Sequence, residues 1–229
     1  KKRSKKQVYI AFDEWNVWYH SKLQDKKILD GNGGWPHAPS ILEDIYNFED
    51  VLQVACILNT FIRRADVVKI ACLAQLVNVI APIMTSKEGG AWRQTIFYPF
   101  LFASRYGRGK SLRLQIDCPS YSWGEIENVP YLDASAVFDE EAASISVFLV
   151  NRHQSDTLEL ELALNGFGEL EISDFQVMAH SDLQATNTEE NPDNVVPVPG
   201  VGAKLKQGVL SVPLKPLSFQ VLRLARPHR

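Results

Sequence analysis

Residues 7–20 read QVYIAFDEWNVWYH, and the interpretation of the whole chain starts from this stretch. It opens with the apolar run Val8–Phe12, which is rich in β-branched and aromatic residues and has the length of a strand. Such a run is typical of a strand that is buried on both faces, as in a parallel sheet. Asp13 and Glu14 follow at once, although a buried carboxylate is costly unless it is paired or hydrogen-bonded. The end of this strand therefore predicts a functional site.

Aromatic residues stand next to the two carboxylates, because Trp15 and Trp18 follow within four positions of Glu14. Aromatic faces cover the apolar side of a sugar ring, and a carboxylate attacks or stabilises the anomeric carbon. The combination indicates a sugar-cleaving site in which Glu14 reacts, Asp13 orients its neighbours and Trp18 lines the sugar subsite. The structural alternative is that Glu14 is a buried carboxylate paired with an arginine and that the tryptophans belong to the core.

The composition is that of a globular protein with a substantial core. Of the 229 residues, 45% are hydrophobic and 22% charged, and the net charge of −3 gives no reason to expect a nucleic-acid partner. Three scattered cysteines form no CxxC motif, which favours a reducing, cytoplasmic location. No apolar stretch is long enough to span a membrane, so no membrane partner is expected. The histidines and cysteines do not cluster, so neither a metal nor another cofactor is expected.

Strands and helices alternate in the first part of the chain, up to Tyr106. The pattern predicts two strands and two helices, at Val8–Phe12, Ile41–Arg63, Val67–Val79 and Thr95–Tyr106, with a long loop at Ser21–Ser40 of the kind that often closes over an active site. This order implies parallel strands with helices on their faces. Two such units can neither close a barrel nor cover both faces of a sheet. We therefore expect this chain to be the C-terminal part of a longer α/β domain.

Short alternating strands separated by turn residues begin after Arg108. Leu158–Leu164, which reads LELELAL, alternates almost strictly between apolar and charged positions. Seven such strands indicate an antiparallel sandwich. They are expected at Leu112–Cys118, Leu132–Phe138, Ile145–Val150, Leu158–Leu164, Phe175–Ala179, Leu205–Val212 and Ser218–Leu224. The expected fold class is therefore α/β plus all-β, with domains at residues 1–106 and 107–229.

Four segments together resemble the C-terminal part of a glycoside hydrolase family 51 α-L-arabinofuranosidase. They are FDEWNVWYH at 12–20, ILNT at 57–60, KIACLAQLVNVIAPIMT at 69–85 and WRQTIFYPF at 92–100, and the resemblance extends over essentially the whole chain. It implies the last two βα units of a (β/α)8 TIM barrel, strands seven and eight, followed by a jelly-roll-like β-sandwich. It also implies a retaining mechanism with Glu14 as the nucleophile, and arabinofuranosyl oligosaccharides derived from arabinoxylan or arabinan as substrates.

The resemblance assigns further roles in substrate binding. It implies that Gln75 hydrogen-bonds the arabinose. Asn16 and Trp35 are also expected to contact substrate, although Asn16 could be a local hydrogen-bonding residue and Trp35 could merely anchor its glycine-rich loop. The acid/base glutamate of the family follows an asparagine, and no Asn-Glu dipeptide occurs in this sequence. We therefore expect that residue on an N-terminal barrel portion, and a homo-oligomer because the family is typically oligomeric.

Two other functions stay open at this point. In one, the sandwich is a non-catalytic module that binds carbohydrate or a partner, and the barrel piece is a remnant. In the other, the barrel and the mechanism are kept but the sugar is different, such as a β-xyloside or a β-glucan.

Overall fold

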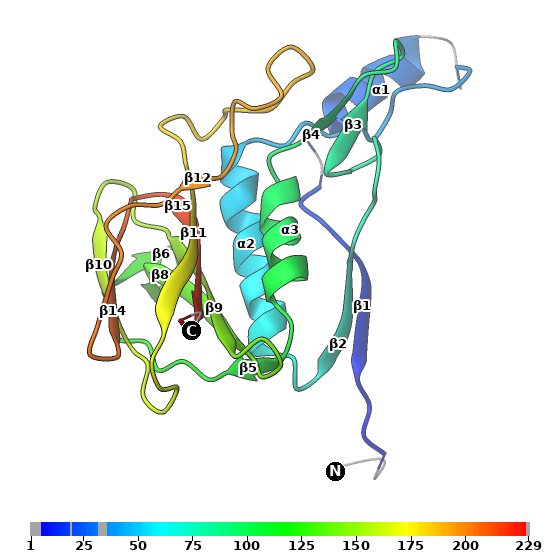
Figure 1. Ribbon diagram of the computed structural model, residues 1–229. Helices are drawn as coiled ribbons and strands as arrows, with labels where there is room; N and C mark the ends of the chain where they lie inside the picture. Colours follow the sequence, from blue (N-terminus) through cyan, green and yellow to red (C-terminus); the bar gives the residue numbers. More distant parts are fainter. Residues whose placement is uncertain (1–5, 19, 32–35, 228–229) are drawn as a thin grey trace.

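The computed structural model describes residues 6–18, 20–31 and 36–227, and its main elements are stacked in layers (Figure 1). One outer layer is a pair of strands, β1 (Ile10–Trp15) and β2 (Val68–Leu73). The helices α2 (Phe48–Arg63) and α3 (Phe97–Tyr106) form the next layer. A six-stranded sheet lies on the other side of the helices, and a three-stranded sheet packs on its far face.

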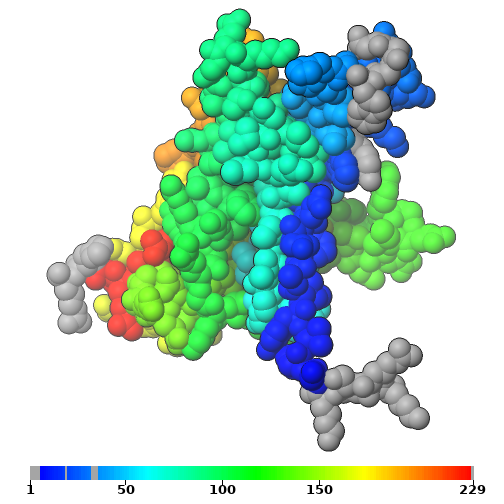
Figure 2. All heavy atoms as spheres, turned by 90° about the vertical axis from the view of Figure 1, so that its right-hand side faces the viewer, coloured from blue at the N-terminus to red at the C-terminus, as the bar shows by residue number. Residues whose placement is uncertain are grey.

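The first layer confirms the predicted parallel pairing, because β1 pairs in parallel with β2. The prediction that the first strand is buried on both faces is wrong for this chain. Only Trp15 is buried in β1, and the side chains of Ile10 and Phe12 are exposed. The physical reason is that β1 has one paired neighbour and helices on one side only, so its other face lies open on the surface (Figure 2). The apolar composition that predicted burial is real, but the described residues cover it only in part: Phe12 packs against Phe61 of α2 and is still 43% exposed.

Helix α2 lies between two cores. Its first turn is capped at Asn47, whose side chain accepts a hydrogen bond from the Asp50 amide while the Asp50 carboxylate accepts one from the Asn47 amide. This capping box explains why the helix begins at Phe48 rather than at Ile41 as predicted. One side of α2 faces the six-stranded sheet, and the opposite side contributes Val54 to a core with β1.

The six-stranded sheet has the strand order β12-β11-β15-β9-β8-β5. Its pairs are antiparallel, and the two central strands are buried along most of their length. In β9, Val147 and Leu149 face the three-stranded sheet, whereas Phe148 and Val150 face the helices. Side chains alternate between the two faces of a strand, so each residue of β9 reaches one of two cores. The strands are β5 (Lys110–Leu112), β8 (Leu132–Asp139), β9 (Ser144–Asn151), β11 (Glu171–Ala179), β12 (Val198–Pro199) and β15 (Ser218–Ala225).

The three-stranded sheet has the order β10-β14-β13, with bounds Leu158–Ala163, Val209–Leu214 and Lys204–Lys206. As predicted, the leucines of β10 point into the sandwich core and its glutamates point outward. The single strand expected at Leu205–Val212 is wrong, because the chain reverses at Gln207 and Gly208, both of which have positive φ. The strand expected at Leu112–Cys118 is also wrong, since only its first residue lies in β5.

Three smaller elements complete the described part of the chain. Helix α1 (Lys22–Gly31) replaces much of the loop that was expected at Ser21–Ser40. The hairpin β3 (Ile83–Thr85) and β4 (Ala91–Arg93) follows β2, which ends at Leu73 and not at Val79 as predicted. The hairpin β6 (Ser120–Trp123) and β7 (Ile126–Pro130) projects from the sandwich (Figure 2).

The helices and the sandwich share one core. Val51 and Ala55 of α2 and Phe102 of α3 pack with Phe148 and Phe219 of the six-stranded sheet. The division of the chain into domains 1–106 and 107–229 stays a prediction.

Candidate functional site

The two predicted carboxylates lie at an irregularity of the β1–β2 ladder. Phe12 pairs with Ala71, and the next pair is Trp15 with Leu73. Asp13 and Glu14 therefore stand opposite a single residue of β2, as in a β-bulge. Bulges re-aim side chains and are over-represented next to active sites. Both carboxylate residues are exposed, so the bulge presents them at the carboxyl end of β1.

Gln75 lies at the corresponding end of the neighbouring strand. Strand β2 ends at Leu73, and the peptide bond between Ala74 and Gln75 is cis. The backbone N–H of Gln75 then donates a hydrogen bond to the Ile80 carbonyl at 3.0 Å, which closes a turn over residues 75–80. Because parallel strands run in one direction, their carboxyl ends meet at the same edge. The structure thus brings Glu14 and Gln75 to one end of the β1–β2 pair, where α1 and the β3–β4 hairpin also lie (Figure 1).

The two nearby tryptophans have different environments. Trp15 is 7% exposed and packs edge-on against Phe61 of α2, so it belongs to the core. Trp18 is 43% exposed and lines a hollow of about 330 Å³ beside α1. Trp18 therefore has an accessible side chain, and its role in binding sugar stays a prediction. Trp35 lies outside the described residues.

Asn16 has a well-defined structural environment. Its side-chain nitrogen donates to the carbonyls of Ala74 at 2.7 Å and Ile80 at 2.6 Å, and its side-chain oxygen accepts from the Val17 amide at 2.8 Å. The local hydrogen-bonding role considered for this residue is therefore present. Its predicted contact with substrate stays a prediction.

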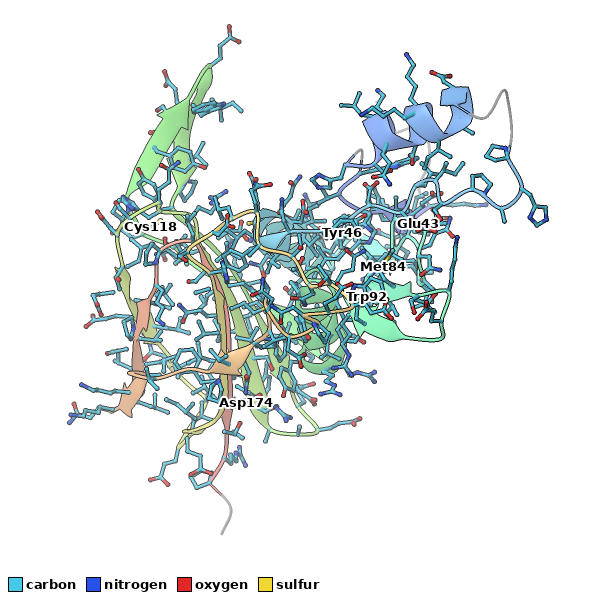
Figure 3. The ribbon with its side chains drawn as sticks, turned by 90° about the horizontal axis from the view of Figure 1, so that it is seen from above. Glu43, Tyr46, Met84, Trp92, Cys118 and Asp174 are labelled. Carbon is cyan, nitrogen blue, oxygen red and sulfur yellow. The ribbon has the colours of Figure 1, made fainter. Side chains whose placement is uncertain are left out.

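A group of polar residues before α2 holds the loop that follows β1. The Asp44 carboxylate accepts hydrogen bonds from the amides of His20 and Ser21, and the Nε2 of His20 lies 3.0 Å from Asp50. Tyr46 is fully buried among the side chains near the start of α2 (Figure 3). Its hydroxyl donates to the Val17 carbonyl at 2.8 Å. Burial, and then the negative charges of Asp44 and Asp50, raise the pKa of the Tyr46 hydroxyl far above its ordinary value. Tyr46 therefore stays protonated and keeps donating this bond.

Gln94 connects this group to the segment after β2. It is fully buried, accepts a hydrogen bond from the Tyr46 amide at 2.9 Å and donates to the carbonyls of Asp44 and Ala81. Sequence reasoning missed Asp44, Tyr46 and Gln94 as supports of the site. No sequence signal marks these long-range contacts, because they join segments that are up to 50 residues apart.

Helix α1 was also missed, although its start carries a recognisable signal. Ser21 is followed three residues later by Gln24, and Gly31 ends the helix. The Ser21 hydroxyl donates to Asp25 at 2.8 Å, and the other oxygen of Asp25 accepts from the Leu42 amide. These contacts fix α1 beside the segment that leads into α2, so that it forms one wall of the hollow at Trp18.

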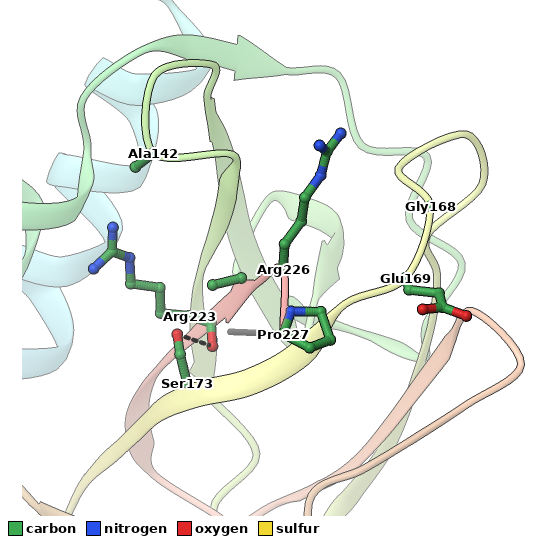
Figure 4. Close-up of a pocket in the computed structure, with 8 residues that line it drawn as sticks. Ala142, Gly168, Glu169, Ser173, Arg223, Arg226 and Pro227 are labelled. Atoms are coloured by element: carbon green, nitrogen blue, oxygen red, sulfur yellow. Dashed lines mark hydrogen bonds between the residues drawn. The ribbon is translucent and has the colours of Figure 1, made fainter. Parts of the chain in front are cut away.

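A second hollow lies on the sandwich and contains none of the predicted site residues. It has a volume of about 1000 Å³ and is lined by residues such as Glu169, Ser173, Arg223 and Arg226 (Figure 4). The Ser173 hydroxyl donates to the Arg223 carbonyl, and the Arg223 guanidinium stacks over the ring of Tyr106. Within the described residues, no group of three or more His, Cys, Asp and Glu side chains is arranged to hold a metal ion.

Comparison with protein families places most of this chain in one known domain. Residues 13–218 match the family model described as the alpha-L-arabinofuranosidase C-terminal domain. The sequence is 49% identical over 226 residues to the intracellular exo-alpha-(1->5)-L-arabinofuranosidase 1 of Bacillus subtilis, and 47% identical over 226 residues to the corresponding protein of Halalkalibacterium halodurans. Each alignment covers 99% of this chain and 44% of the relative. The chain thus spans less than half the length of these curated relatives.

Comparison with solved structures gives the same grouping. A family 51 alpha-L-arabinofuranosidase from Bifidobacterium longum superposes with a TM-score of 0.87 at 32% sequence identity. The superposition covers 96% of this chain and 43% of that structure. Among the described residues, no helix is both long and apolar enough to cross a membrane.

Proposed function

Because the chain belongs to the α-L-arabinofuranosidase C-terminal domain family, we propose that it is part of a retaining exo-glycoside hydrolase that releases terminal α-L-arabinofuranosyl residues from arabinoxylan or arabinan oligosaccharides. Family membership confirms the resemblance found in the sequence. The observation that carries the catalytic proposal is the position of Glu14, an exposed carboxylate at a bulge at the carboxyl end of a parallel strand. In (β/α)8 barrels, catalytic residues come from these strand ends.

In this proposal, β1 and β2 are the seventh and eighth strands of a barrel, and an N-terminal barrel portion supplies the other six. The open face and edge of the pair support it. Val8, Tyr9 and Ile10 are exposed on β1 or just before it, and Ile70 is 53% exposed on β2. Soluble proteins rarely leave such a continuous apolar surface uncovered unless a partner binds there. Barrel closure would give β1 and β2 the neighbours that they lack here.

The chemistry requires two carboxyl groups. Ionised Glu14 attacks the anomeric carbon and forms a glycosyl-enzyme ester while an acid on the proposed N-terminal barrel portion protonates the leaving oxygen. The conjugate base of that acid then removes a proton from water, which hydrolyses the ester and restores the Glu14 carboxylate. In retaining enzymes the two carboxyl groups lie about 5–5.5 Å apart. This chain supplies the nucleophile and not the acid/base.

The sugar subsite is proposed to include Gln75 and Trp18. Gln75 is exposed just after β2, and the end of β2 lies beside the end of β1 that carries Glu14. There the side-chain amide of Gln75 can hydrogen-bond a sugar hydroxyl. Trp18 offers an indole face beside a hollow. Asp13, next to Glu14 at the bulge, is placed to orient the substrate or the nucleophile. Trp35 completes the proposed set of contacts, and Asn16 is proposed to support it from the end of β1.

The setting of the enzyme is a further part of the proposal. The two curated relatives described above are named intracellular, and three scattered cysteines suit a reducing compartment, so we propose a cytoplasmic protein. We also propose a homo-oligomer and no cofactor. The alternative of a non-catalytic binding module is not favoured, because the relatives that align with nearly the whole chain are named as enzymes.

The decisive experiment replaces Glu14 in the protein that combines this chain with its barrel portion. Glu14→Gln should lower the rate of hydrolysis of 4-nitrophenyl α-L-arabinofuranoside by about 10³-fold or more, as expected for loss of a nucleophile. The matched control is Glu49→Gln, an exposed carboxylate in the first turn of α2. Near-normal activity of Glu14→Gln would contradict the proposal. A faster rate on the corresponding xyloside would instead mean that the enzyme acts on xylosides and not on arabinofuranosides.

The covalent step has its own test. A fluorinated arabinofuranosyl inhibitor that forms a slowly hydrolysed ester should label the peptide that contains Glu14, as judged by mass spectrometry after proteolysis. Labelling elsewhere, with none on this peptide, would assign the nucleophile to another residue.

A further inference from the structure

The side chain of Asn16 is placed to couple the two strand ends of the proposed site. Asn16 follows Glu14 by two residues, directly after β1. Its side-chain nitrogen donates two hydrogen bonds to the segment that follows β2, one to the Ala74 carbonyl and one to the Ile80 carbonyl. Its oxygen is used within its own segment, by the Val17 amide. The carboxamide therefore joins the end of β1 to two points that are six residues apart.

Those two points bracket Gln75. Ala74 directly precedes it, and the Ile80 carbonyl also accepts the hydrogen bond from the Gln75 amide. The Ala74 amide in turn donates to the Trp15 carbonyl at 3.0 Å. Thus the backbone on both sides of Gln75 is bonded, directly or through Asn16, to the two residues that follow Glu14.

We propose that Asn16 is a positioning residue that sets the place of Gln75 relative to Glu14. This inference rests on the proposed function for its effect on catalysis, but its structural part stands on the hydrogen bonds alone. Asn16 acts through the backbone of the turn over residues 75–80 and does not itself need to touch the reacting atoms. The hydrogen bonds of Asn16 fix both ends of this short turn relative to β1. The backbone position of Gln75 is therefore fixed without any contact to its side chain.

The surrounding contacts indicate that losing Asn16 would shift this turn and not unfold it. The Asn78 amide donates to the Ile83 carbonyl, and the Ile80 amide donates to the Leu42 carbonyl at 2.7 Å. These bonds attach the turn to β3 and to the segment before α2, neither of which depends on Asn16. Without the carboxamide, the turn would stay attached to those neighbours but would be held less firmly to β1.

The test compares two asparagines with the same kind of environment. Asn16→Asp keeps the acceptor for Val17 but places a carboxylate oxygen against two carbonyls. Asn187→Asp is the matched control, because the Asn187 side chain also bridges two carbonyls, those of Arg93 and Val195, and accepts from a backbone amide. Asn16→Ala removes the donors without adding a charge, and serves if the aspartate variant does not fold.

Hydrogen–deuterium exchange on the 229-residue chain gives the structural readout. Peptides that cover residues 74–80 should exchange at least about 10-fold faster in the Asn16 variants, and at the wild-type rate in Asn187→Asp. Unchanged exchange in folded Asn16 variants would overturn the proposal. This arm does not depend on activity, so it decides the positioning role even if the complete protein proves not to hydrolyse arabinofuranosides.

Kinetics with 4-nitrophenyl α-L-arabinofuranoside, in the protein assembled with its barrel portion, give the second readout. Asn16→Ala should lower kcat/KM by about 10²-fold, the size expected when a binding group is displaced by about 1 Å. In a Gln75→Ala background the same change should lower kcat/KM by no more than about 3-fold, because its effect passes through Gln75. Equal losses in both backgrounds would show that Asn16 acts independently of Gln75 and would overturn the proposal. A wild-type protein without activity would instead refute the proposed function.

Discussion

Arg63 and Asp133 form a two-pronged ion pair that joins the last turn of α2 to the start of β8. Each of two guanidinium nitrogens lies 3.1 Å from one oxygen of the carboxylate. The Asn59 side chain donates to the same carboxylate at 2.8 Å. The side chain of Asp133 is 14% exposed and that of Arg63 is 34% exposed, so the pair is half-buried, and its hydrogen bonds are charge-assisted. It fixes the helix layer to the sandwich at the end opposite the capping box.

Removing this carboxylate should weaken the whole chain. Asp133→Ala is expected to lower the free energy of unfolding by about 2–3 kcal/mol, because it removes the three hydrogen bonds that Arg63 and Asn59 donate to this carboxylate. Urea denaturation followed by circular dichroism measures this loss. The control is Asp66→Ala, which breaks the solvent-exposed Arg64–Asp66 pair and should leave the unfolding midpoint unchanged. Similar midpoints for both variants would mean that the half-buried Arg63–Asp133 pair contributes no more than the exposed Arg64–Asp66 pair.

The buried hydroxyl of Tyr46 predicts a loss of stability at alkaline pH. The folded state raises its pKa above the usual value, first through burial and then through the charges of Asp44 and Asp50. A group with a raised pKa in the folded state contributes stability that is complete below the unfolded pKa, about 10 for tyrosine, and lost as pH rises above it. The free energy of unfolding should therefore fall above about pH 10 with a slope of up to about 1.4 kcal/mol per pH unit from this residue.

Tyr46→Phe isolates this contribution. At neutral pH it should lower stability by about 1–2 kcal/mol, because the Val17 carbonyl loses its buried donor. Above about pH 10 the variant should lose stability less steeply than the wild type, so that the two curves converge. Denaturant titrations at several pH values measure both effects. Parallel curves would show that Tyr46 does not titrate differently in the folded and unfolded states.

Local patterns in the sequence account for much of the fold. The LELELA run of β10 places leucines inward and glutamates outward, as its period of two requires. The run at Thr95–Tyr106 becomes α3, and the order of elements correctly predicts the parallel pairing of β1 with β2. In each of these cases the pattern that identifies the element also determines which face it buries.

The errors arise where tertiary contacts override local patterns. The apolar run Val67–Val79 reads as one strand, but its second half is held in a turn. Asn16 donates to the carbonyls of Ala74 and Ile80, and the Ile80 amide donates to the Leu42 carbonyl. The predicted burial of β1 fails for a different reason. Its composition suits a strand between two neighbours, and the described part of this chain provides only one.

The candidate site also has features that the sequence predicts and features that it does not. Glu14 and Gln75 stand at neighbouring strand ends, and that relationship follows from the order of elements. The bulge at Glu14 and the bridging amide of Asn16 do not follow, because both depend on how residue 14 aligns with a segment about 60 positions later. A single sequence contains no measure of that alignment.

The reactivity of the cysteines can show whether the open face of β2 is covered. Cys72 is exposed there, and the next residue, Leu73, points the other way into the core that Trp15 shares with α2. Burial, and then the charge of Asp133, raise the pKa of the Cys56 thiol to about 12, so only about one molecule in 10⁴ carries the reactive thiolate at pH 8.

Iodoacetamide at pH 8 should therefore modify Cys72 of the 229-residue chain at least about 10-fold faster than Cys56, as followed by peptide mass spectrometry. In the protein assembled with the proposed barrel portion, Cys72 should be protected, because the closed barrel would cover this face of β2. Cys118, half-buried beside the sandwich core, serves as the internal reference and should react at the same rate in both samples. Equal reactivity of Cys72 in both samples would mean that the partner does not cover this face, and would contradict the placement of β1 and β2 as the last two strands of a barrel.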